Sequence, residues 1–230
     1  MKIDIFMVRT LSLFSDVSDA ELTRLMMHAT ARRVDRGDAV FEQGEDADTF
    51  YLLLNGRLKV TQLTPEGRQI MVRILHPGDI FGFARATTRR DYPVTARAAV
   101  ESIVVGWSLT AWDAVVEATP RVAINAMRIV GERLDEAHTR LCEMSTQEVE
   151  RRIAHTVLRI ARKAGRKEAD GICIDFPITR QDIAEMTGST LHTVSRIMSA
   201  WEVQGIVGSG RQKLVVCNPA GLMQIAEGHP

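Results

Sequence analysis

Residues 179–216 read TRQDIAEMTGSTLHTVSRIMSAWEVQGIVGSGRQKLVV, and this stretch decides the fold. Thr179 is of a residue type that caps helices, and it predicts a short helix over about 180–187. Gly188 breaks that helix, and the apolar spacing that follows predicts a second helix over about 191–204. Two short helices joined by a glycine-containing turn are the helix-turn-helix pattern.

The residues after the second helix predict a β-hairpin. Gly205-Ile206-Val207 and Lys213-Leu214-Val215-Val216 lie on either side of the turn Gly208-Ser209-Gly210. A hairpin that follows a helix-turn-helix is the wing of a winged helix. We therefore expect residues 147–230 to form a winged helix-turn-helix domain.

The second helix has two contrasting faces. Leu191, Val194, Ile197, Met198 and Trp201 are expected to form its core side. On the opposite side, small polar residues and one arginine can enter the major groove of DNA, where arginine donates two hydrogen bonds to guanine. The predicted base-reading residues are His192, Thr193, Ser195 and Arg196, and the predicted phosphate contacts are Arg180, Thr190, Ser199, Arg211 and Lys213. Any one of these basic residues alone could be a solvated surface residue, but their order together favours DNA binding.

The N-terminal half has a different sequence pattern, with short β-type runs broken by glycine over residues 33–108. Asn55-Gly56 is hairpin-turn chemistry, because glycine takes a positive φ without steric cost. Short strands at regular spacing with such turns predict an antiparallel barrel or sandwich over residues 1–115. We interpret the glycines as turn residues and not as a phosphate cradle, since none of them opens a predicted helix.

A heptad seam lies in the helical segment that follows, within a long helix expected over residues 116–146. Its members recur every three or four residues: Met127, Val130, Leu134, Ala137, Leu141 and Met144. A seam this narrow favours a partner helix, so these six residues are the predicted dimer interface of a homodimer. The alternative, a helix lying on its own barrel, stays open because the seam spans fewer than three heptads.

Composition and cysteine usage set limits on the class of protein. The chain has 45% hydrophobic and 25% charged residues, which is ordinary for a globular protein. No apolar run reaches the length of a membrane span, and Asp4 interrupts what would be the apolar region of a secretory signal. Cys142, Cys173 and Cys217 lie far apart with no metal-site spacing, so we expect no metal, no membrane association and a reducing, cytoplasmic location.

Charge and motifs narrow the function further. The net charge is zero, and residues 147–230 carry 11 basic against 9 acidic residues, so DNA affinity must come from a local basic face. The sequence contains no nucleophile elbow, phosphate loop, His-Glu metal motif or paired-acid constellation. We therefore expect no catalytic residues and do not interpret the chain as an enzyme.

Three stretches resemble the CRP/FNR family of bacterial transcription regulators over residues 10–218. They are FEQGEDADTFYLLLNGRLKVTQLTPEGRQIMVRILHPGDIFG, ERRIAHTVLRIA and the helix-turn-helix stretch quoted first. The resemblance implies an α+β protein: an N-terminal antiparallel β-roll (a cyclic-nucleotide-binding-like barrel), a long dimerisation helix and a C-terminal winged helix-turn-helix. It also implies a homodimer on palindromic double-stranded DNA, with RNA polymerase as a further partner if the protein is an activator.

The sequence departs from family members that bind cyclic AMP. Those members carry a Gly-Glu pair, whose glutamate holds the ribose, and a downstream Arg-Ser or Arg-Thr, whose arginine pairs with the cyclic phosphate. Here Gly82 is followed by Phe83, and Tyr92-Pro93 occupies the place of the second pair. A buried phosphate without its arginine would pay a large desolvation cost, so we expect cyclic AMP not to bind.

The remaining resemblance is to the nitric-oxide-responsive, denitrification branch of the family, because no cysteine precedes Cys142 to hold an iron–sulfur centre. That branch implies an apolar effector pocket and, in some members, haem. The residues expected to form the pocket are Phe81, Gly82, Phe83, Tyr92 and Pro93. His28, His76, His138 and His155 are candidate haem ligands by residue type alone, so the cofactor stays open.

Two alternatives stay open beside a DNA-binding regulator with a small effector. One is an effector-binding module that acts through protein contacts, against which the basic residues of the winged helix count. The other is a regulator that does bind a cyclic nucleotide or another anion. The sequence leaves activation or repression, the target genes and the half-site undecided.

Overall fold

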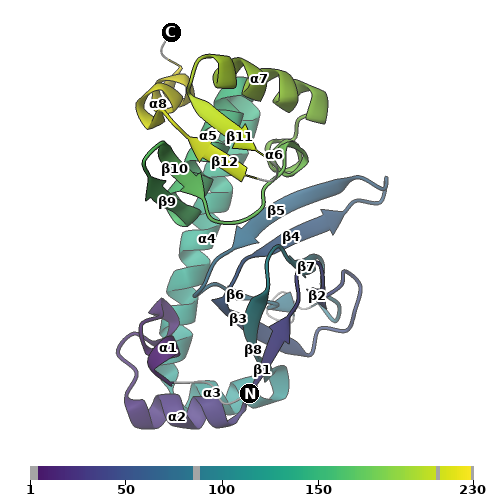
Figure 1. The fold of residues 1–230 in the computed structure, drawn as a ribbon. Helices are drawn as coiled ribbons and strands as arrows, with labels where there is room; N and C mark the ends of the chain where they lie inside the picture. The colour runs from purple at the N-terminus through teal and green to yellow at the C-terminus, as the bar shows by residue number, and fades with distance from the viewer. Residues whose placement is uncertain (1–4, 85–88, 211–212, 229–230) are drawn as a thin grey trace. The chain divides into compact units, whose positions relative to one another are not determined.

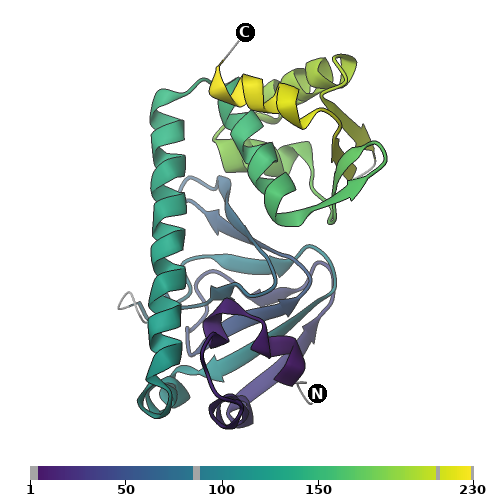
Figure 2. The same ribbon diagram turned by 90° about the vertical axis from the view of Figure 1, so that its left-hand side faces the viewer.

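The computed structural model describes residues 5–84, 89–210 and 213–228, which divide into two compact units. The first unit comprises Met1–Leu63 and Ile74–Ala137, and the second comprises Thr64–Arg73 and His138–Pro230. The division falls inside the long helix α4, Pro120–Thr146, which Figure 2 shows as one unbroken helix. The contacts therefore group the chain differently from the three segments expected from the sequence. No helix in the described part of the chain is long and apolar enough to cross a membrane.

The N-terminal strands form two antiparallel sheets (Figure 1). One sheet has the order β1-β8-β3-β6 and the other β2-β7-β4-β5. The strands are β1 Ala29–Val34, β2 Ala39–Phe41, β3 Thr49–Asn55, β4 Leu58–Leu63, β5 Gln69–Leu75, β6 Ile80–Phe81, β7 Thr95–Ala98 and β8 Ser102–Ser108. The antiparallel roll expected from the sequence is thus confirmed, with β1 starting four residues earlier than the expected 33.

Gly56 lies in a turn of this roll that requires glycine. It has φ +92°, and a Cβ at this position would collide with the Oγ of Ser102. A residue with a side chain would therefore meet both backbone strain and a steric clash. The Asn55-Gly56 pair is where the sequence predicted a turn between two strands.

Short helices cover one face of the β1-β8-β3-β6 sheet. They are α1 Ile5–Arg9, the 3₁₀ turn η1 Ser12–Phe14, α2 Asp19–Met27 and α3 Leu109–Ala118. A reciprocal capping box is present at α2, where Ser18 and Glu21 each accept the other's backbone N–H. Phe50, Trp107 and Leu22 are each at most 2% exposed in the core beneath these helices, and Trp107 Nε1 donates to Leu25 O at 3.0 Å.

The segment that follows β8 forms two helices, α3 and α4. The chain leaves helical geometry at Thr119, and Pro120 is the first residue of α4. Proline suits the first helical position because its missing N–H has no intrahelical partner there, and it disfavours a helical conformation in the residue before it. The expected dimerisation helix therefore begins at Pro120 and not at residue 116.

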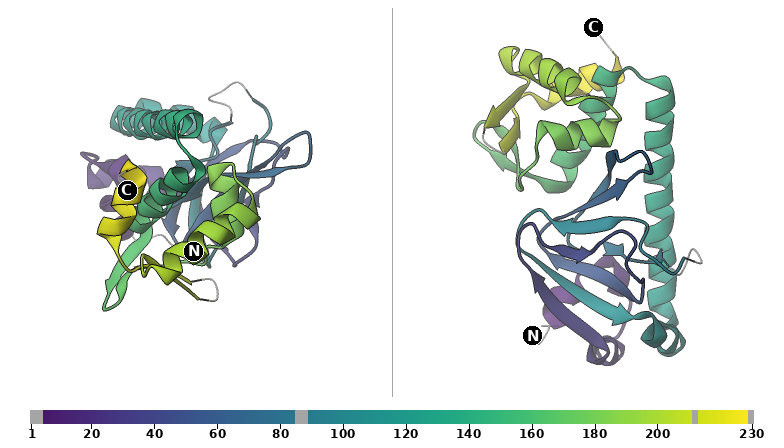
Figure 3. Two further views of the ribbon diagram at one scale, coloured as in Figure 1. Left: turned by 90° about the horizontal axis from the view of Figure 1, so that it is seen from above. Right: turned by 90° about the vertical axis from the view of Figure 1, so that its right-hand side faces the viewer.

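The C-terminal unit is a winged helix with flanking elements, seen from above in Figure 3. Its helices are α5 Val149–Ala164, α6 Arg180–Thr187, α7 Leu191–Val203 and α8 Pro219–Glu227, and α8 packs on α5. A four-stranded sheet has the order β11-β12-β10-β9, from Val207–Gly210, Lys213–Val216, Gly171–Ile174 and Gly165–Glu168. Residues 163–167 contain the end of α5 and the start of β9, whose backbone pairs with β10.

Candidate nucleic-acid interface

Helix α6 is fixed at both ends by its own sequence. Thr179 Oγ1 accepts the N–H of Asp182 at 3.1 Å, and Asp182 Oδ2 accepts the N–H of Thr179 at 2.7 Å. This reciprocal capping box satisfies backbone donors that the first turn leaves free. Gly188, at φ +61°, ends the helix in the left-handed conformation. The turn between the two predicted helices is therefore set by Gly188.

Helix α7 is seated on the domain by one buried side. Thr190 Oγ1 caps it by accepting the N–H of Thr193 at 3.1 Å. Val194, Met198 and Trp201 are each at most 1% exposed, and Trp201 Nε1 donates to Glu150 on α5 at 3.0 Å. This packing fixes which face of α7 points outward.

The outward face of α7 carries the predicted base-reading residues. His192, Arg196 and Ser199 are exposed, and Thr193 and Ser195 are partly exposed. Within the described part of the chain, no hydrogen bond or ion pair engages the Arg196 side chain, so its guanidinium is available to a ligand. Leu191, which the sequence grouped with the core side, is 48% exposed at the start of the helix, because Val194 and not Leu191 begins the buried stripe.

Arg180, a predicted phosphate contact, is already engaged within the domain. Its guanidinium donates to Ser199 Oγ at 3.1 Å and to Ser195 O at 3.4 Å, and it forms an ion pair with Glu202 at 2.8 Å. Arg180 and Lys213 both line a hollow of about 250 Å³ whose apolar walls include Ile183. The structure therefore brings these two predicted phosphate contacts together at one concavity.

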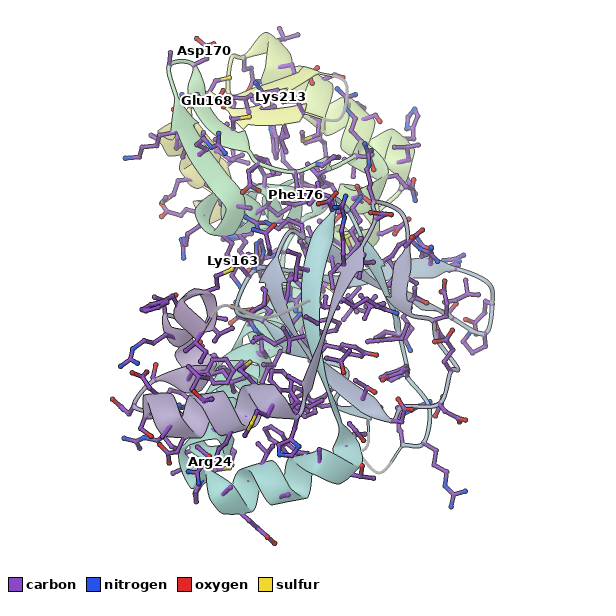
Figure 4. The ribbon with its side chains drawn as sticks, turned by 60° about the horizontal axis from the view of Figure 1, so that its bottom comes forward. Arg24, Lys163, Glu168, Asp170, Phe176 and Lys213 are labelled. Atoms are coloured by element: carbon purple, nitrogen blue, oxygen red, sulfur yellow. The ribbon has the colours of Figure 1, made fainter. Side chains whose placement is uncertain are left out.

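Lys213 on β12 is 54% exposed and pairs with Glu168 on β9 at 3.5 Å (Figure 4). The neighbouring Cys173 and the Glu168 carboxylate raise the pKa of Lys213 above its usual range, which favours its charged form. Arg211, the other wing residue predicted to contact phosphate, lies outside the described residues.

The residues expected to form an effector pocket fall into two aromatic groups. Phe81 and Tyr92 lie with Phe41, whose ring stacks on Tyr92 with centroids 3.8 Å apart. Phe83 instead stacks on Phe50, at 5.2 Å, in the core under the helices. Gly82 and Pro93 are half-buried beside these aromatic residues in the sequence. Phe81 and Tyr92 therefore share one aromatic group, and Phe83 belongs to the other.

Tyr92 is held tightly where the resemblance places the phosphate-binding arginine of other members. It is 2% exposed, its hydroxyl donates to Thr49 O at 2.5 Å, and burial raises the pKa of the phenol well above its ordinary value. Phe41, stacked on it, is 4% exposed. This part of the roll is filled by aromatic rings.

The heptad seam is exposed along its whole length in the single chain. Met127 is 67% exposed, Leu134 69% and Leu141 62%, and Val130, Ala137 and Met144 are exposed as well. A different stripe of α4, containing Val122, Ala126 and Ile129, packs into the core. Helix α4 therefore has two apolar stripes. One packs into the core of its own chain, and the other, the heptad seam, is exposed.

Comparison with known proteins matches two domain families to the two ends of the chain. Residues 31–119 match the cyclic nucleotide-binding domain, and residues 151–225 match the Crp-like helix-turn-helix domain. The transcriptional regulator LdrP of Thermus thermophilus is 31% identical over 193 residues, which cover 83% of this chain and 94% of LdrP. The chain belongs to the CRP/FNR family.

Other members of the CRP/FNR family resemble it along most of its length. A solved structure of a CRP-family transcriptional regulator from Thermus thermophilus has a TM-score of 0.73 at 29% identity, covering 86% of this chain and 97% of that one. A CRP-like cAMP-activated global transcriptional regulator of Mycobacterium tuberculosis is 23% identical over 84% of this chain and 86% of that protein. These relatives are transcription regulators, which supports a DNA-binding regulator.

Some residues of the site were not singled out from the sequence of this CRP/FNR member. Glu202 and Glu168 pair with predicted phosphate contacts, and Phe41 completes the aromatic group around Tyr92. The signal for Glu202 is its spacing from Ser195 and Ser199, four and then three residues, which places all three on one side of α7.

Proposed function

We propose that this protein is a sequence-specific regulator that binds palindromic DNA as a homodimer, with α7 in the major groove. The observation that carries the proposal is the exposed, unengaged guanidinium of Arg196 beside His192, on a helix whose other side is buried. Arginine reads guanine through two hydrogen bonds, and histidine can donate to a guanine acceptor. His192, Thr193, Ser195 and Arg196 are the proposed base-reading set, and Leu191 can contact a thymine methyl.

The proposed phosphate contacts surround this set. Thr190 and Ser199 lie at two points along α7, and Arg180 and Lys213 share the hollow between α6 and the wing. Hydroxyls and cations in such positions fix the register of a protein on DNA without reading its sequence. Arg211 is proposed for the same role from its place in the sequence of the wing.

The dimer is proposed from the exposed seam of α4. Apolar side chains from Met127 to Met144 that face water in one chain would be buried against the same seam of a second chain. Burial of a leucine contributes about 1.5–3 kcal/mol, so a pair of seams supplies a substantial driving force. Two-fold symmetry then places two copies of α7 on successive major grooves.

The proposed effector is small and is not cyclic AMP. Tyr92 and Phe41 fill the part of the roll where a cyclic phosphate would need a cation, and Tyr92 supplies none. The rings of Phe41 and Tyr92 also stack on one another at 3.8 Å and leave no open face between them for a haem. A response to nitric oxide is therefore proposed from the family resemblance alone, with no step assigned to haem.

Two experiments test this function. In the first, the protein captures fragments of its own organism's genome. If it is a cytoplasmic transcription regulator, the captured DNA should be enriched in promoter fragments over coding fragments. Enrichment of RNA polymerase without DNA would favour the alternative module that acts through protein contacts. The second is the absorption spectrum of protein purified without oxygen, before and after nitric oxide, where a haem band would overturn the account of the aromatic cluster.

A further inference from the structure

Arg180 connects the first residue of α6 to three successive turns of α7. One Nη1 atom donates to Ser195 O at 3.4 Å and to Ser199 Oγ at 3.1 Å, while Nη2 pairs with Glu202 Oε1 at 2.8 Å. The side chains of Arg180 and Glu202 are 31% and 29% exposed, so about two-thirds of each is shielded from water. A planar guanidinium held at three points on one helix resists rotation of that helix.

The stripe that Arg180 holds lies next to the stripe that is proposed to read DNA. Ser195, Ser199 and Glu202 follow one another at intervals of four and three residues, which is one side of a helix. His192, Arg196 and Ser199 follow the same intervals, and the two stripes share Ser199. Arg196 is therefore less than one turn of α7 away from Ser195 and Ser199, and loss of the Arg180 contacts should alter the position of the Arg196 side chain.

The other anchors of α7 act from a different direction. Val194, Met198 and Trp201 are buried on the inner side, and Trp201 Nε1 is bonded to Glu150 of α5. Apolar packing of this kind sets how deep the helix sits but is non-directional, whereas the hydrogen bonds of a guanidinium fork have a fixed direction. The Arg180 fork supplies the lateral restraint.

We propose that Arg180 is a positioning residue for α7, with Glu202 as its required counter-charge, so that base reading by Arg196 depends on the Arg180–Glu202 pair. The proposal rests on the proposed DNA-binding function and deepens it. Three contacts of the guanidinium are directed at α7, and Arg180 has further N–H groups that can meet a DNA phosphate. Positioning and phosphate contact are thus compatible in one side chain.

An electrostatic role and a positioning role of Glu202 predict opposite changes in operator affinity when its carboxylate is removed. A carboxylate near the DNA-binding face repels phosphates, so its removal should strengthen binding to every sequence if charge alone matters. If Glu202 instead holds the Arg180 fork, its removal should weaken binding to the operator and leave binding to unrelated DNA nearly unchanged. The sign of the change therefore separates the two accounts.

The test compares the full-length wild type with Glu202→Gln, Arg180→Lys and Ser199→Ala on the selected operator and on a scrambled duplex across a range of salt concentrations. Arg180→Lys keeps the charge but loses the planar fork, and Ser199→Ala removes one contact with little risk to folding. Glu185→Gln is the matched control, because it removes the same charge from α6 without touching α7. Thermal unfolding of each variant identifies any loss of the fold itself.

We expect Glu202→Gln and Arg180→Lys to lower operator affinity about tenfold, with Ser199→Ala intermediate, and to weaken the preference at the base pair read by Arg196. Glu202→Gln alters no proposed DNA contact, so its binding to the scrambled duplex and its slope of affinity against salt should stay close to those of the wild type. Operator affinity that rises in Glu202→Gln, as it should slightly in Glu185→Gln, would overturn the proposal. A wild-type protein with no preference for any operator would instead refute the proposed function, independently of Arg180.

Discussion

Arg133 of α4 forms an ion pair with Asp79, whose side chain is 7% exposed in the turn before β6. Arg133 also bonds Glu136 one turn further along α4, at 3.0 Å. This pair continues the stripe of Val122, Ala126 and Ile129 that faces the core. The next residue, Leu134, is thereby turned outward and is 69% exposed.

Leu134→Glu should convert the protein to monomers that lose operator binding. Each buried leucine contributes about 1.5–3 kcal/mol at the proposed seam, and a charge there would also have to be desolvated. Sedimentation at micromolar concentration measures the change. Met27→Glu is the control, because Met27 is also 69% exposed but lies on α2. A Leu134→Glu protein that is still dimeric would place the interface elsewhere.

Asp79→Asn should destabilise the N-terminal unit without changing the core packing. Removing one partner of a fully buried ion pair costs about 3–5 kcal/mol, and we expect about 1–3 kcal/mol here since Arg133 is 26% exposed and keeps Glu136. Denaturant unfolding followed by tryptophan fluorescence measures the loss. An unchanged unfolding midpoint would show that the pair contributes nothing to the attachment of α4.

Arg196→Ala should cost about 1–3 kcal/mol per half-site and relax the preference at a single base pair. His192→Glu should alter the inner bases of the half-site, because glutamate accepts from cytosine whereas histidine can donate to guanine. Operator selection with each variant measures both effects. An operator unchanged by Arg196→Ala would contradict the assignment of this residue to base reading.

Lys213→Ala is the matched comparison for Arg196→Ala. Lys213 lies on the wing beside Glu168 and is proposed to meet phosphate, so its loss should weaken binding to all sequences alike. The slope of affinity against salt should flatten by about one unit. A change in base preference would instead show that Lys213 contacts the edges of the bases.

Cyclic AMP should not bind measurably in calorimetry. The buried ring of Tyr92 lies where the resemblance places a phosphate-pairing arginine, and its hydroxyl is already bonded to Thr49 O. A phosphate there would lose its hydration without gaining a cation. Micromolar affinity would show that the aromatic group opens and that the effector is a cyclic nucleotide after all.

The winged helix was largely predictable from the sequence because its signals are local. Thr179, Gly188 and Thr190 set the ends of α6 and α7, and each acts within four residues along the chain. The strand β9 was missed because Arg166 and Lys167 have the composition of a linker and pair with β10 only through their backbone. The pairs of Arg180 with Glu202 and of Arg133 with Asp79 join residues 22 and 54 positions apart, which periodicity does not detect.

The arrangement of the expected effector-pocket residues was also not predictable from local sequence signals. Phe81 and Phe83 are two positions apart and would lie on the same face of a continuous strand, but β6 ends at Phe81. The chain turns at Gly82, at φ +85°, and delivers Phe83 to Phe50 on the other side of the sheet. The sequence therefore identified the aromatic residues but not their division into two groups.

Selection of binding sites from a pool of random duplexes tests the central claim most directly. The wild-type protein should enrich a palindrome whose half-site centres lie about one helical turn apart, with a guanine at the position read by Arg196 in each half. That result requires a two-fold dimer and a base-reading α7 together. A pool that stays random, or an enriched site without two-fold symmetry, would contradict the account.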